Sequence, residues 1–594
     1  MAQSCLATLV RGRNRVRKRE PMSLMKTAVD VAVVLIVLLV SAAVAAEESA
    51  GGTTMTTRPM PASPSATQAM LDAAGGDTKN WLQPNGSYEQ TRYYAGAHIN
   101  AGNVGRIKPA FVFQTGVLES MQTAPIVVDG VMFLTTSFNH VYAIDAATGE
   151  EFWRYRHKPG PIAAGCCGND NRGVAIAGGM LFMGTNDARV VALDARTGKV
   201  RWEQQLSDPE RGLSATMAPT VVDGKVLIGA DGGAHGMRGF VKAFSAVDGS
   251  LLWTFHTIPD KGHEGVWAES DATGRKLRRD IAAEKRMLAE KGGEFHQTLG
   301  GGIATTPAID RKTRTVFLAV GSPAPAFHGA IRPGDNLYTD SIVAIDLDKG
   351  TYKWHFQYIA HDVWNLGAVS PPILTQAREK AGKMVDVVIH GGKTGHIYVH
   401  ERSTGRLIRA SEPMIPQENV WSPPNIAGAR MLPGANGGVE WSPLAVNPKT
   451  RLAYAANLHQ PMTYHVDDTP YPGGRTWPGG ASRAIPGEEQ WGRLVAVNID
   501  TGKVAWGVKT PQPLIGGVLA TAGNLVFNGE ANGWFKAFDA ISGKELWKYN
   551  CGAGVNAPAV SYTVGGRQYV AVAAGGNGQI DAKRGNSVFV FALP

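Results

Sequence analysis

The chain has 594 residues and a formal net charge of +9, with 18% charged residues and only 4 cysteines. Residues 1–46 contain seven Lys or Arg residues and only two acidic residues, Glu20 and Asp30. Residues 47–594 therefore carry a net charge of only about +4. This balance, without interleaved aromatic and basic residues, excludes the electrostatic footprint expected of a nucleic-acid-binding protein.

The N-terminal residues 1–46 predict a secretory signal peptide. A basic run, RGRNRVRKRE, precedes an aliphatic stretch at 31–40 and then the small residues SAAVAA, with cleavage expected after Ala46. The apolar part is short for a membrane span, although an uncleaved anchor stays an alternative. The pattern therefore predicts export to the periplasm and a mature chain without a membrane span.

The segment 47–77 is rich in Thr, Pro, Ser and Ala and has no apolar periodicity up to about residue 70. This composition is typical of a disordered segment. We therefore expect a disordered lead-in over 47–77, followed by one folded domain over 78–594.

A short signature recurs through that domain and indicates its architecture. Alternating apolar residues are followed by a turn that ends in Gly, and Trp comes four residues after that Gly. Each copy reads as two strands joined by a tight turn. A degraded seventh copy ends at Arg409. The other six copies end at Trp153, Trp202, Trp253, Trp354, Trp506 and Trp547.

The step between signature glycines is about fifty residues, with an unmarked copy in each long gap, which is the length of one propeller blade. Trp at a fixed offset from Gly indicates packing between neighbouring blades, because a blade cannot bury its apolar face alone. The sequence therefore predicts an all-β fold, an eight-bladed β-propeller with tryptophan-docking repeats.

Cys166 and Cys167 are adjacent in the run CCGNDNRG, which continues to Arg172. A disulfide between neighbours would hold the Cα atoms closer than the ordinary range of roughly 4.4–6.8 Å, so it would be strained, and strain of this kind marks functional sites. Two buried free thiols stay the alternative. Export favours the disulfide, and it leaves Cys551 as a buried thiol.

Other patterns are less informative. The chain contains no CxxCH, so no covalent haem domain is expected. Residues 280–295 are the clear helix candidate, and their charge spacing indicates a solvated face rather than a site.

Together these motifs resemble the quinoprotein alcohol dehydrogenases, which use pyrroloquinoline quinone (PQQ). The resemblance rests on the Trp repeats and on the adjacent cysteines before NRG. It also rests on four further runs: LIGADGGAHGMRGF, IRPGDN at 331–336, AHDVW at 360–364 and GGVLATAGNLVF at 516–527. It implies PQQ on the axis of the propeller, capped by a disulfide between Cys166 and Cys167.

The resemblance also implies which residues hold the quinone. Arg172 matches the Arg that contacts the quinone, Lys393 matches a second cation, and Thr216 matches a hydroxyl donor to a PQQ carboxylate. Gly232 and Gly233 match a close backbone approach. A Glu of the family falls on Gln122, unless Glu119 takes its place through a small loop shift.

The cation ligands and the base depart from the family pattern. The two metal-binding positions fall on Ala234 and Ser322, and the catalytic Asp falls on Asn365. Alanine offers no ligand atom, and an amide is no base at neutral pH. A calcium or lanthanide ion therefore lacks its implied ligands, and the site residues include no predicted metal ligand.

Further departures lie beside these positions. The extra Asp of lanthanide users is Gly367, and the stacking Trp is replaced near Ala304. Asp362 is the weak candidate for a substitute base, and His235 for a ligand of a softer metal.

Two functions from different classes follow. The first is a periplasmic PQQ-dependent alcohol or aldehyde dehydrogenase that passes electrons to a soluble cytochrome c. The second is a non-catalytic propeller of the same ancestry, acting as a sensor or binding module. A scaffold in outer-membrane assembly is weaker, since such a scaffold has no use for adjacent cysteines.

Overall fold

The computed structural model describes residues 51–60, 64–160, 168–208, 212–232, 236–291, 295–379, 381–470 and 477–594. The chain divides into two units, Met1–Gly51 and Gly52–Pro594, and all described helices and strands belong to the second. The predicted signal peptide at 1–46 and the cysteine pair at 166–167 lie outside the described residues. No helix in the described part of the chain has the length and apolar character needed to cross a bilayer.

The described residues of the second unit form eight sheets of four or five strands and one sheet of three. Within each larger sheet, neighbouring strands of the four-strand motif pair antiparallel. The first four sheets follow the chain in order. The first contains β4 (Ile126–Val128), β5 (Val131–Thr135), β6 (Val141–Asp145) and β7 (Glu151–Arg156), and the second contains β8 (Ala175–Ala177), β9 (Met180–Gly184), β10 (Arg189–Asp194) and β11 (Val200–Gln205). The third contains β12 (Thr220–Val222), β13 (Lys225–Gly229), β14 (Phe240–Ser245) and β15 (Leu251–His256), and the fourth contains β16 (Ala308–Asp310), β17 (Thr315–Val320), β18 (Ser341–Asp346) and β19 (Tyr352–Gln357).

The remaining sheets continue this order. The fifth contains β20 (Ile373–Arg378), β21 (Met384–Gly391), β22 (Ile397–Glu401) and β23 (Leu407–Ala410), and the sixth contains β25 (Ala445–Asn447), β26 (Leu452–His459), β29 (Trp491–Asn498) and β30 (Val504–Thr510). The seventh contains β31 (Leu519–Thr521), β32 (Leu525–Gly529), β33 (Trp534–Asp539) and β34 (Glu545–Asn550), with β2 (Tyr93–Tyr94) at its edge. The eighth contains β35 (Val560–Val564), β36 (Arg567–Ala574), β37 (Ser587–Ala592) and β3 (Lys108–Gln114).

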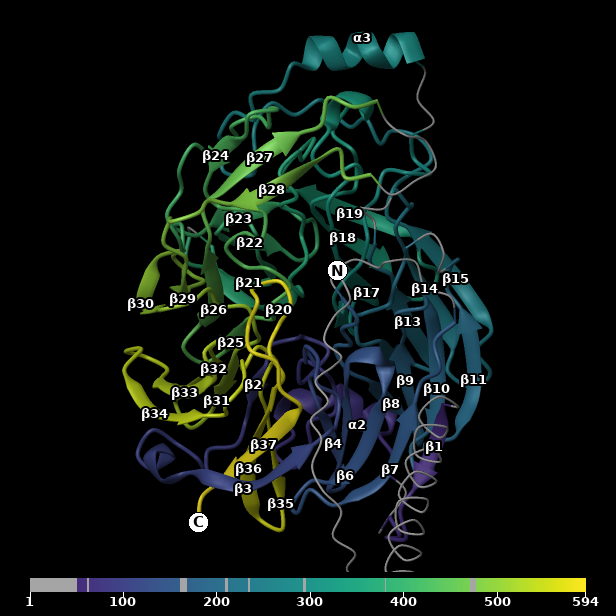
Figure 1. The fold of residues 1–594 in the computed structure, drawn as a ribbon, viewed down its shortest axis with the longest axis vertical. Coiled ribbons are helices and arrows are strands. Elements are labelled where there is room, and N and C mark those ends of the chain that lie inside the picture. The colour runs from purple at the N-terminus through teal and green to yellow at the C-terminus, as the bar shows by residue number, and fades with distance from the viewer. Residues whose placement is uncertain are drawn as a thin grey trace, which may run out of the picture. The chain divides into compact units, whose positions relative to one another are not determined.

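The last sheet joins the two ends of the domain. Its outer strand β3 comes from the start of the domain and pairs antiparallel with β37, from Lys108 opposite Ala592 to Gln114 opposite Ser587. Figure 1 shows the blue β3 beside the yellow β36 and β37. Because the first and last segments share one sheet, the series of sheets closes into a ring without a free end.

Neighbouring sheets are held together by the signature residues. A Cβ placed on Gly198 would lie 2.6 Å from the Trp153 ring, and one on Gly249 would lie 2.7 Å from the Trp202 ring. The same contact joins three further pairs: Trp253 with Gly350, Trp354 with Gly405, and Trp506 with Gly543. The tryptophan of one sheet therefore lies flat on the turn glycine of the next, as the spacing predicts.

Hydrogen bonds supplement this docking. The indole N–H groups of Trp153, Trp202 and Trp506 each donate to a carbonyl of the next sheet at 3.2 Å. In the degraded copy, Arg409 takes the place of Trp, and its guanidinium donates to the carbonyls of Ile499, at 2.9 Å, and Asp500. Polar contacts thus replace the ring contact at that one junction.

The lead-in predicted to be disordered contains ordered elements. β1 (Gly52–Met55) pairs antiparallel with the outer strand β7, and α2 (Gln68–Asp72) buries Leu71. A short 3₁₀ turn, η1 (Ala74–Gly76), follows. The prediction of disorder over 47–77 is therefore wrong for these residues, because the edge of β7 offers backbone hydrogen bonds that composition alone does not reveal.

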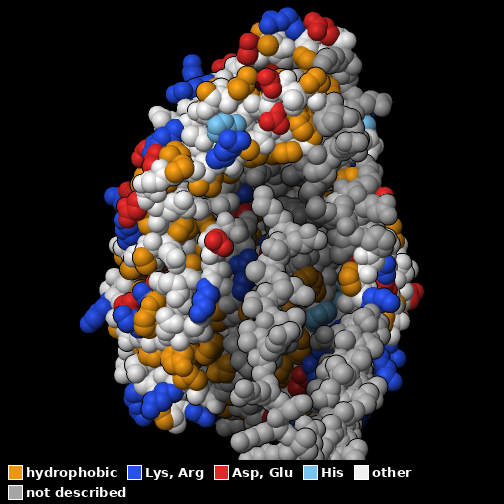
Figure 2. All heavy atoms as spheres, in the orientation of Figure 1, with side chains coloured by type: hydrophobic (Ala, Val, Ile, Leu, Met, Phe, Trp, Pro, Cys, Tyr) orange, Lys and Arg blue, Asp and Glu red, His pale blue; other side chains and the backbone are white. Residues whose placement is uncertain are grey.

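Three excursions among the described residues leave the ring. The first carries the helix α3 (Ile281–Lys291). The second, between β23 and β25, carries β24 (Ala429–Met431), and the third, between β26 and β29, carries β27 (Met462–Val466) and β28 (Gly480–Ala484), and these three strands form the three-stranded sheet. Further 3₁₀ turns in the described part of the chain are η2 (Val104–Arg106), η3 (Ser137–Asn139) and η6 (Gly329–Ile331). Figure 2 shows basic and acidic side chains interspersed over the described part of the visible face.

Two glycine substitutions in one sheet test the docking contact. Gly224 and Gly249 have φ of +70° and +74°, so alanine costs roughly 1–2 kcal/mol at either position. A Cβ at Gly224 meets nothing within 4 Å, whereas one at Gly249 meets the Trp202 ring. We expect Gly249→Ala to lose about 1–3 kcal/mol more than Gly224→Ala in urea unfolding followed by fluorescence. Equal losses would contradict docking.

Candidate cofactor site at the hub

Residues before the first strand of six sheets converge on one region, which we call the hub. A small cavity there is lined by residues that immediately precede β4, β8, β16, β20, β25 and β35: Gln122, Ala124, Arg172, Thr305, Thr306, Pro371, Trp441, Pro443 and Pro558, with Pro84 and Asn85. The cavity has about 20 Å³, so it is far smaller than a quinone. It locates the point at which loops from six sheets meet.

Arg172 joins three of these loops. It is only 8% exposed. Its Nη1 donates to Thr216 Oγ1 at 2.6 Å and to the Ala304 carbonyl at 2.9 Å, and the guanidinium lies 4.9 Å from the centre of the Trp441 ring. Its buried Nε has no hydrogen-bond acceptor among the described residues. A buried cation with an unused donor is an arrangement that favours an anionic ligand.

Lys393 supplies a second buried cation from the loop between β21 and β22. Its Nζ lies 3.2 Å from Glu440 Oε1 and donates to the carbonyls of Ala435, at 3.1 Å, and Asn365, at 3.3 Å. Lys393 and Glu440 are each 6% exposed. Glu440 precedes Trp441, so residues 440–441 connect the two cations.

The sequence analysis missed Glu440 and Trp441. They occur in the run GGVEWSP at 437–443, where one acidic residue interrupts an otherwise uncharged turn before β25. An isolated carboxylate at such a position requires a buried partner, and that requirement is the signal that could have identified it. Gly437 permits the approach, because a Cβ there would lie 2.4 Å from Lys393 Cα.

Gln122 and Glu119 occupy different surroundings. Gln122 lines the hub cavity and donates through Nε2 to Asp170 Oδ2 at 2.5 Å. Glu119 instead pairs with Arg584 at 2.8 Å, and the Ser120 N–H and Arg584 lower the pKa of its carboxyl. Burial raises the pKa of the Asp170 carboxyl, a hub residue that the sequence analysis also missed.

Asp362 holds the conformation of its own loop. Its Oδ1 accepts the Trp364 N–H and its Oδ2 accepts the Leu366 N–H, each at 2.8 Å, and the residue is fully buried. Both carboxylate oxygens therefore have backbone donors. The catalytic role suggested for Asp362 by its place in the sequence stays a prediction.

The residues at the positions that the family resemblance assigns to a calcium or lanthanide ion do not fit such an ion. Ser322 Oγ accepts the Gly367 N–H at 2.9 Å, and a Cβ on Gly367 would lie 2.4 Å from Ser322 N, so no larger residue fits at 367 without a shift. Asn365 has φ of +58° and turns its carbonyl to Lys393. No group of three His, Cys, Asp or Glu side chains suited to a metal occurs among the described residues.

Gly232 lies at a close backbone contact, since a Cβ there would lie 2.4 Å from the Gly212 carbonyl oxygen. Its φ is +103°, so the position favours glycine for two independent reasons. Gly233, Ala234 and His235 lie outside the described residues, as do Cys166 and Cys167.

Comparison with known proteins places this fold and site in one family. Residues 81–420 and 410–570 match the PQQ family described as "Glucose/ethanol/alcohol dehydrogenase, beta-propeller domain". The chain is 32% identical to the quinohemoprotein alcohol dehydrogenase of Comamonas testosteroni, over 84% of this chain and 73% of that protein. It is 33% identical to the quinoprotein alcohol dehydrogenase PedH of Pseudomonas putida, over 84% and 88%.

A solved structure of a europium-containing methanol dehydrogenase has a TM-score of 0.77 at 27% identity, covering 88% of this chain and all of that one. The chain belongs to the PQQ-dependent dehydrogenase propeller family. The resemblance and the all-β propeller fold predicted from the sequence are confirmed, and the relatives support an oxidoreductase.

The buried ion pair between Lys393 and Glu440 can be tested by measuring the free energy of unfolding. Glu440→Gln leaves a buried ammonium without its counter-ion, and we expect a loss of about 3–5 kcal/mol in urea unfolding. The double variant Lys393→Met, Glu440→Leu should recover much of that loss. The matched control is Glu489→Gln at the exposed pair with Lys509, for which we expect about 0.5 kcal/mol or less. Similar losses at both pairs would contradict the buried contact.

Proposed function

We propose that this chain is a PQQ-dependent oxidoreductase that acts on alcohols or aldehydes, with the quinone at the hub. One observation carries the proposal: Arg172 and Lys393 are buried cations linked through residues 440–441, and Arg172 Nε has no acceptor in the part of the chain that the structure describes. A polyanionic quinone supplies acceptors for such donors. The chain's similarity to quinoprotein alcohol dehydrogenases supports this ligand.

When bound, PQQ supplies a carbonyl carbon that accepts hydride from the alcohol carbon. The chain's own residues would bind and orient it: Arg172 and Lys393 would donate to its oxygens, and Thr216 would offer a hydroxyl next to Arg172. The residues at 322 and 365 do not fit a calcium or lanthanide ion. Asn365 cannot accept the alcohol proton, because an amide nitrogen is not basic.

Four finer features belong to the same proposal. Residues 1–46 direct export to the periplasm, and Cys166 and Cys167 form a disulfide over the quinone. A soluble cytochrome c accepts the electrons, since the chain has no CxxCH of its own. Each of the eight larger sheets is one blade of the propeller, and the sheet shared by β3 and β37 is the blade that closes the ring.

The second candidate is a non-catalytic propeller of the same ancestry that acts as a sensor or binding module. Ser322, Asn365 and Gly367 favour it, because none of them supplies the carboxylate that a cation or a proton needs. The fold tolerates these replacements, since the sheets dock through the Trp and Gly repeats and not through the hub.

One reconstitution experiment separates the candidates. The mature chain is mixed with PQQ and either calcium or lanthanum, and both cofactor absorbance and ethanol-dependent dye reduction are recorded. Uptake with turnover supports the oxidoreductase, and uptake without turnover supports the second candidate. Absence of uptake with either metal rejects the oxidoreductase.

Removal of either buried cation, Arg172 or Lys393, should weaken the binding of the quinone. We expect Lys393→Met and Arg172→Met each to weaken PQQ binding at least about tenfold in a fluorescence titration, since each removes charge-assisted hydrogen bonds. Lys509→Met removes an exposed lysine and should leave the affinity unchanged. Circular dichroism confirms that each variant is folded. Unchanged affinity in both hub variants would place the quinone elsewhere.

Restoring the missing carboxylates at positions 234 and 365 should increase calcium-dependent turnover. The variant Ala234→Glu, Asn365→Asp restores two acidic positions, and we expect calcium-dependent turnover to rise at least about a hundredfold over the unaltered chain. The single variant Asn365→Asp controls for the base alone. No rise in the double variant would show that these two positions do not limit calcium-dependent turnover.

A further inference from the structure

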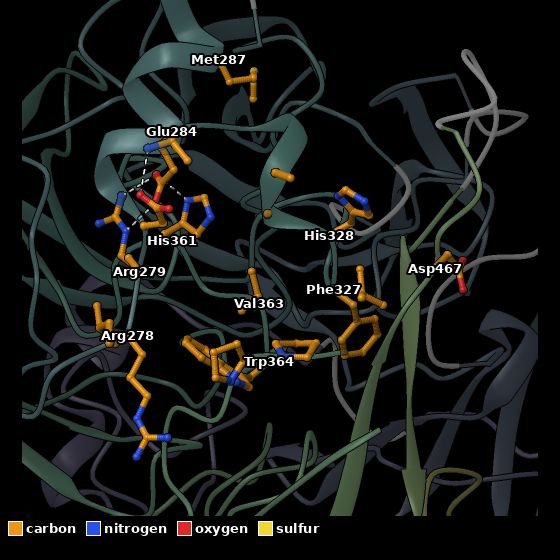
Figure 3. Close-up of a pocket in the computed structure, with 18 of the residues that line it drawn as sticks. Arg278, Arg279, Glu284, Met287, Phe327, His328, His361, Val363, Trp364 and Asp467 are labelled. Carbon is orange, nitrogen blue, oxygen red and sulfur yellow. Dashed lines mark hydrogen bonds and ion pairs between the residues drawn. The ribbon is translucent and has the colours of Figure 1, made fainter. Parts of the chain in front are cut away.

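A second, larger cavity lies beneath α3, away from the hub. It has a volume of about 670 Å³, and its walls come from α3, the η6 turn and the segments at 361–364, 423–426 and 466–468. None of its lining residues lines the hub cavity. Figure 3 shows Phe327, Val363 and Trp364 below α3 and Met287 above them. We call this cavity the α3 pocket.

Buried ion pairs fix α3 over the pocket. Arg279 donates to Asp335 Oδ1 at 2.6 Å and to Glu284 Oε2 at 2.8 Å, and all three side chains are largely buried. The Gly334 N–H donates to Glu284 Oε2 at 3.0 Å. The first turn of α3 is thereby attached to the loop that carries IRPGDN. The pocket therefore has a built wall, whereas the sequence indicated only a solvated helix face.

Apolar side chains dominate the lining. Met287 and Phe327 contribute from the α3 and η6 side, and Val363, Trp364 and Ile426 from the other. The Trp364 indole N–H already donates to the Ser422 carbonyl at 2.8 Å, so Trp364 has no further donor to offer. Cavities of this volume and character are typical of sites for small molecules.

His361 places one unpartnered acceptor in this lining. The residue is 7% exposed. Its Nδ1 lies 2.9 Å from the Gly334 carbonyl and 3.2 Å from Glu284 Oε2, and because both are acceptors, Nδ1 carries the proton. Burial, with Arg332 and Arg279, holds the pKa of His361 well below its usual range. The ring is therefore neutral, and Nε2 is left with a free lone pair.

No hydrogen bond of Nε2 occurs among the described residues, and Nε2 points toward Gly329, another lining residue, where a Cβ would lie 2.3 Å away. A bound molecule that donates one hydrogen bond would satisfy this nitrogen. The rim selects against anions, because exposed Asp280, Asp467 and Asp468 outnumber Arg278 there.

We propose that the α3 pocket binds an uncharged alkylphenol, whose alkyl chain and ring fill the apolar volume and whose hydroxyl donates to His361 Nε2. Phe327 and Trp364 offer aromatic surfaces to the ring. The site is separate from the hub: the loop at 361–366 turns His361 and Trp364 to the pocket and the Asn365 carbonyl to Lys393. Binding therefore requires no quinone and does not depend on the proposed redox function.

Paired substitutions on α3 test the location. Ala283 lines the pocket, whereas its neighbour Ala282 is exposed and does not. Binding of 4-butylphenol to the full mature chain is measured by calorimetry without PQQ. We expect Ala283→Phe to abolish binding by filling the pocket and Ala282→Phe to leave it unchanged. Retained binding in Ala283→Phe, or no binding to the unaltered chain, would overturn the proposal.

A second pair of measurements tests the role of His361. We expect the unaltered chain to bind 4-butylphenol about 5–10-fold more tightly than butylbenzene, which lacks the hydroxyl. In His361→Phe the ring is kept but both nitrogens are gone, so the position offers no acceptor, and the preference should fall to about one. A preference that persists in His361→Phe would assign the hydroxyl to another acceptor and refute the proposed contact.

Discussion

The contact between a tryptophan of one sheet and a turn glycine of the next is the constraint on which the rest of the structure depends. Each ring lies where a Cβ would be, at 2.6 Å for Gly198 and 2.7 Å for Gly249, so only glycine permits the approach. The contact repeats around the ring and fixes the spacing of the sheets. The pairing of β3 with β37 then joins the first and last segments of the domain in one sheet, so the series of sheets closes.

The ring of sheets brings loops from six sheets to one point, and this convergence makes a polar hub possible inside an apolar fold. Arg172 and Lys393 are expensive to bury, and each has an assigned partner: Thr216 and Trp441 for the first, Glu440 for the second. The docking contacts do not involve these side chains. Replacement at Ser322, Asn365 or Gly367 can therefore change the chemistry of the hub without changing the fold.

The loop at 361–366 has two faces. One face reaches Lys393 through the Asn365 carbonyl, and the other presents His361 and Trp364 to the α3 pocket. Asp362 stabilises this division, because its two oxygens bind the N–H groups of Trp364 and Leu366. One short segment thus separates a charged site from an apolar one.

The sequence by itself determined the repeating hairpins, the docking tryptophans and the family, because each depends on residues a fixed short distance apart, such as Gly249 and Trp253. The resemblance to that family also pointed to Arg172, Thr216 and Lys393, whose roles toward a quinone stay a prediction. Only the tertiary structure decided that Glu440 neutralises Lys393, that β1 extends the sheet of β7, and that Arg279 and Asp335 hold α3 over a pocket. These contacts join residues tens to about a hundred positions apart, and no local pattern encodes such pairings, because they form only when segments distant in the sequence pack together.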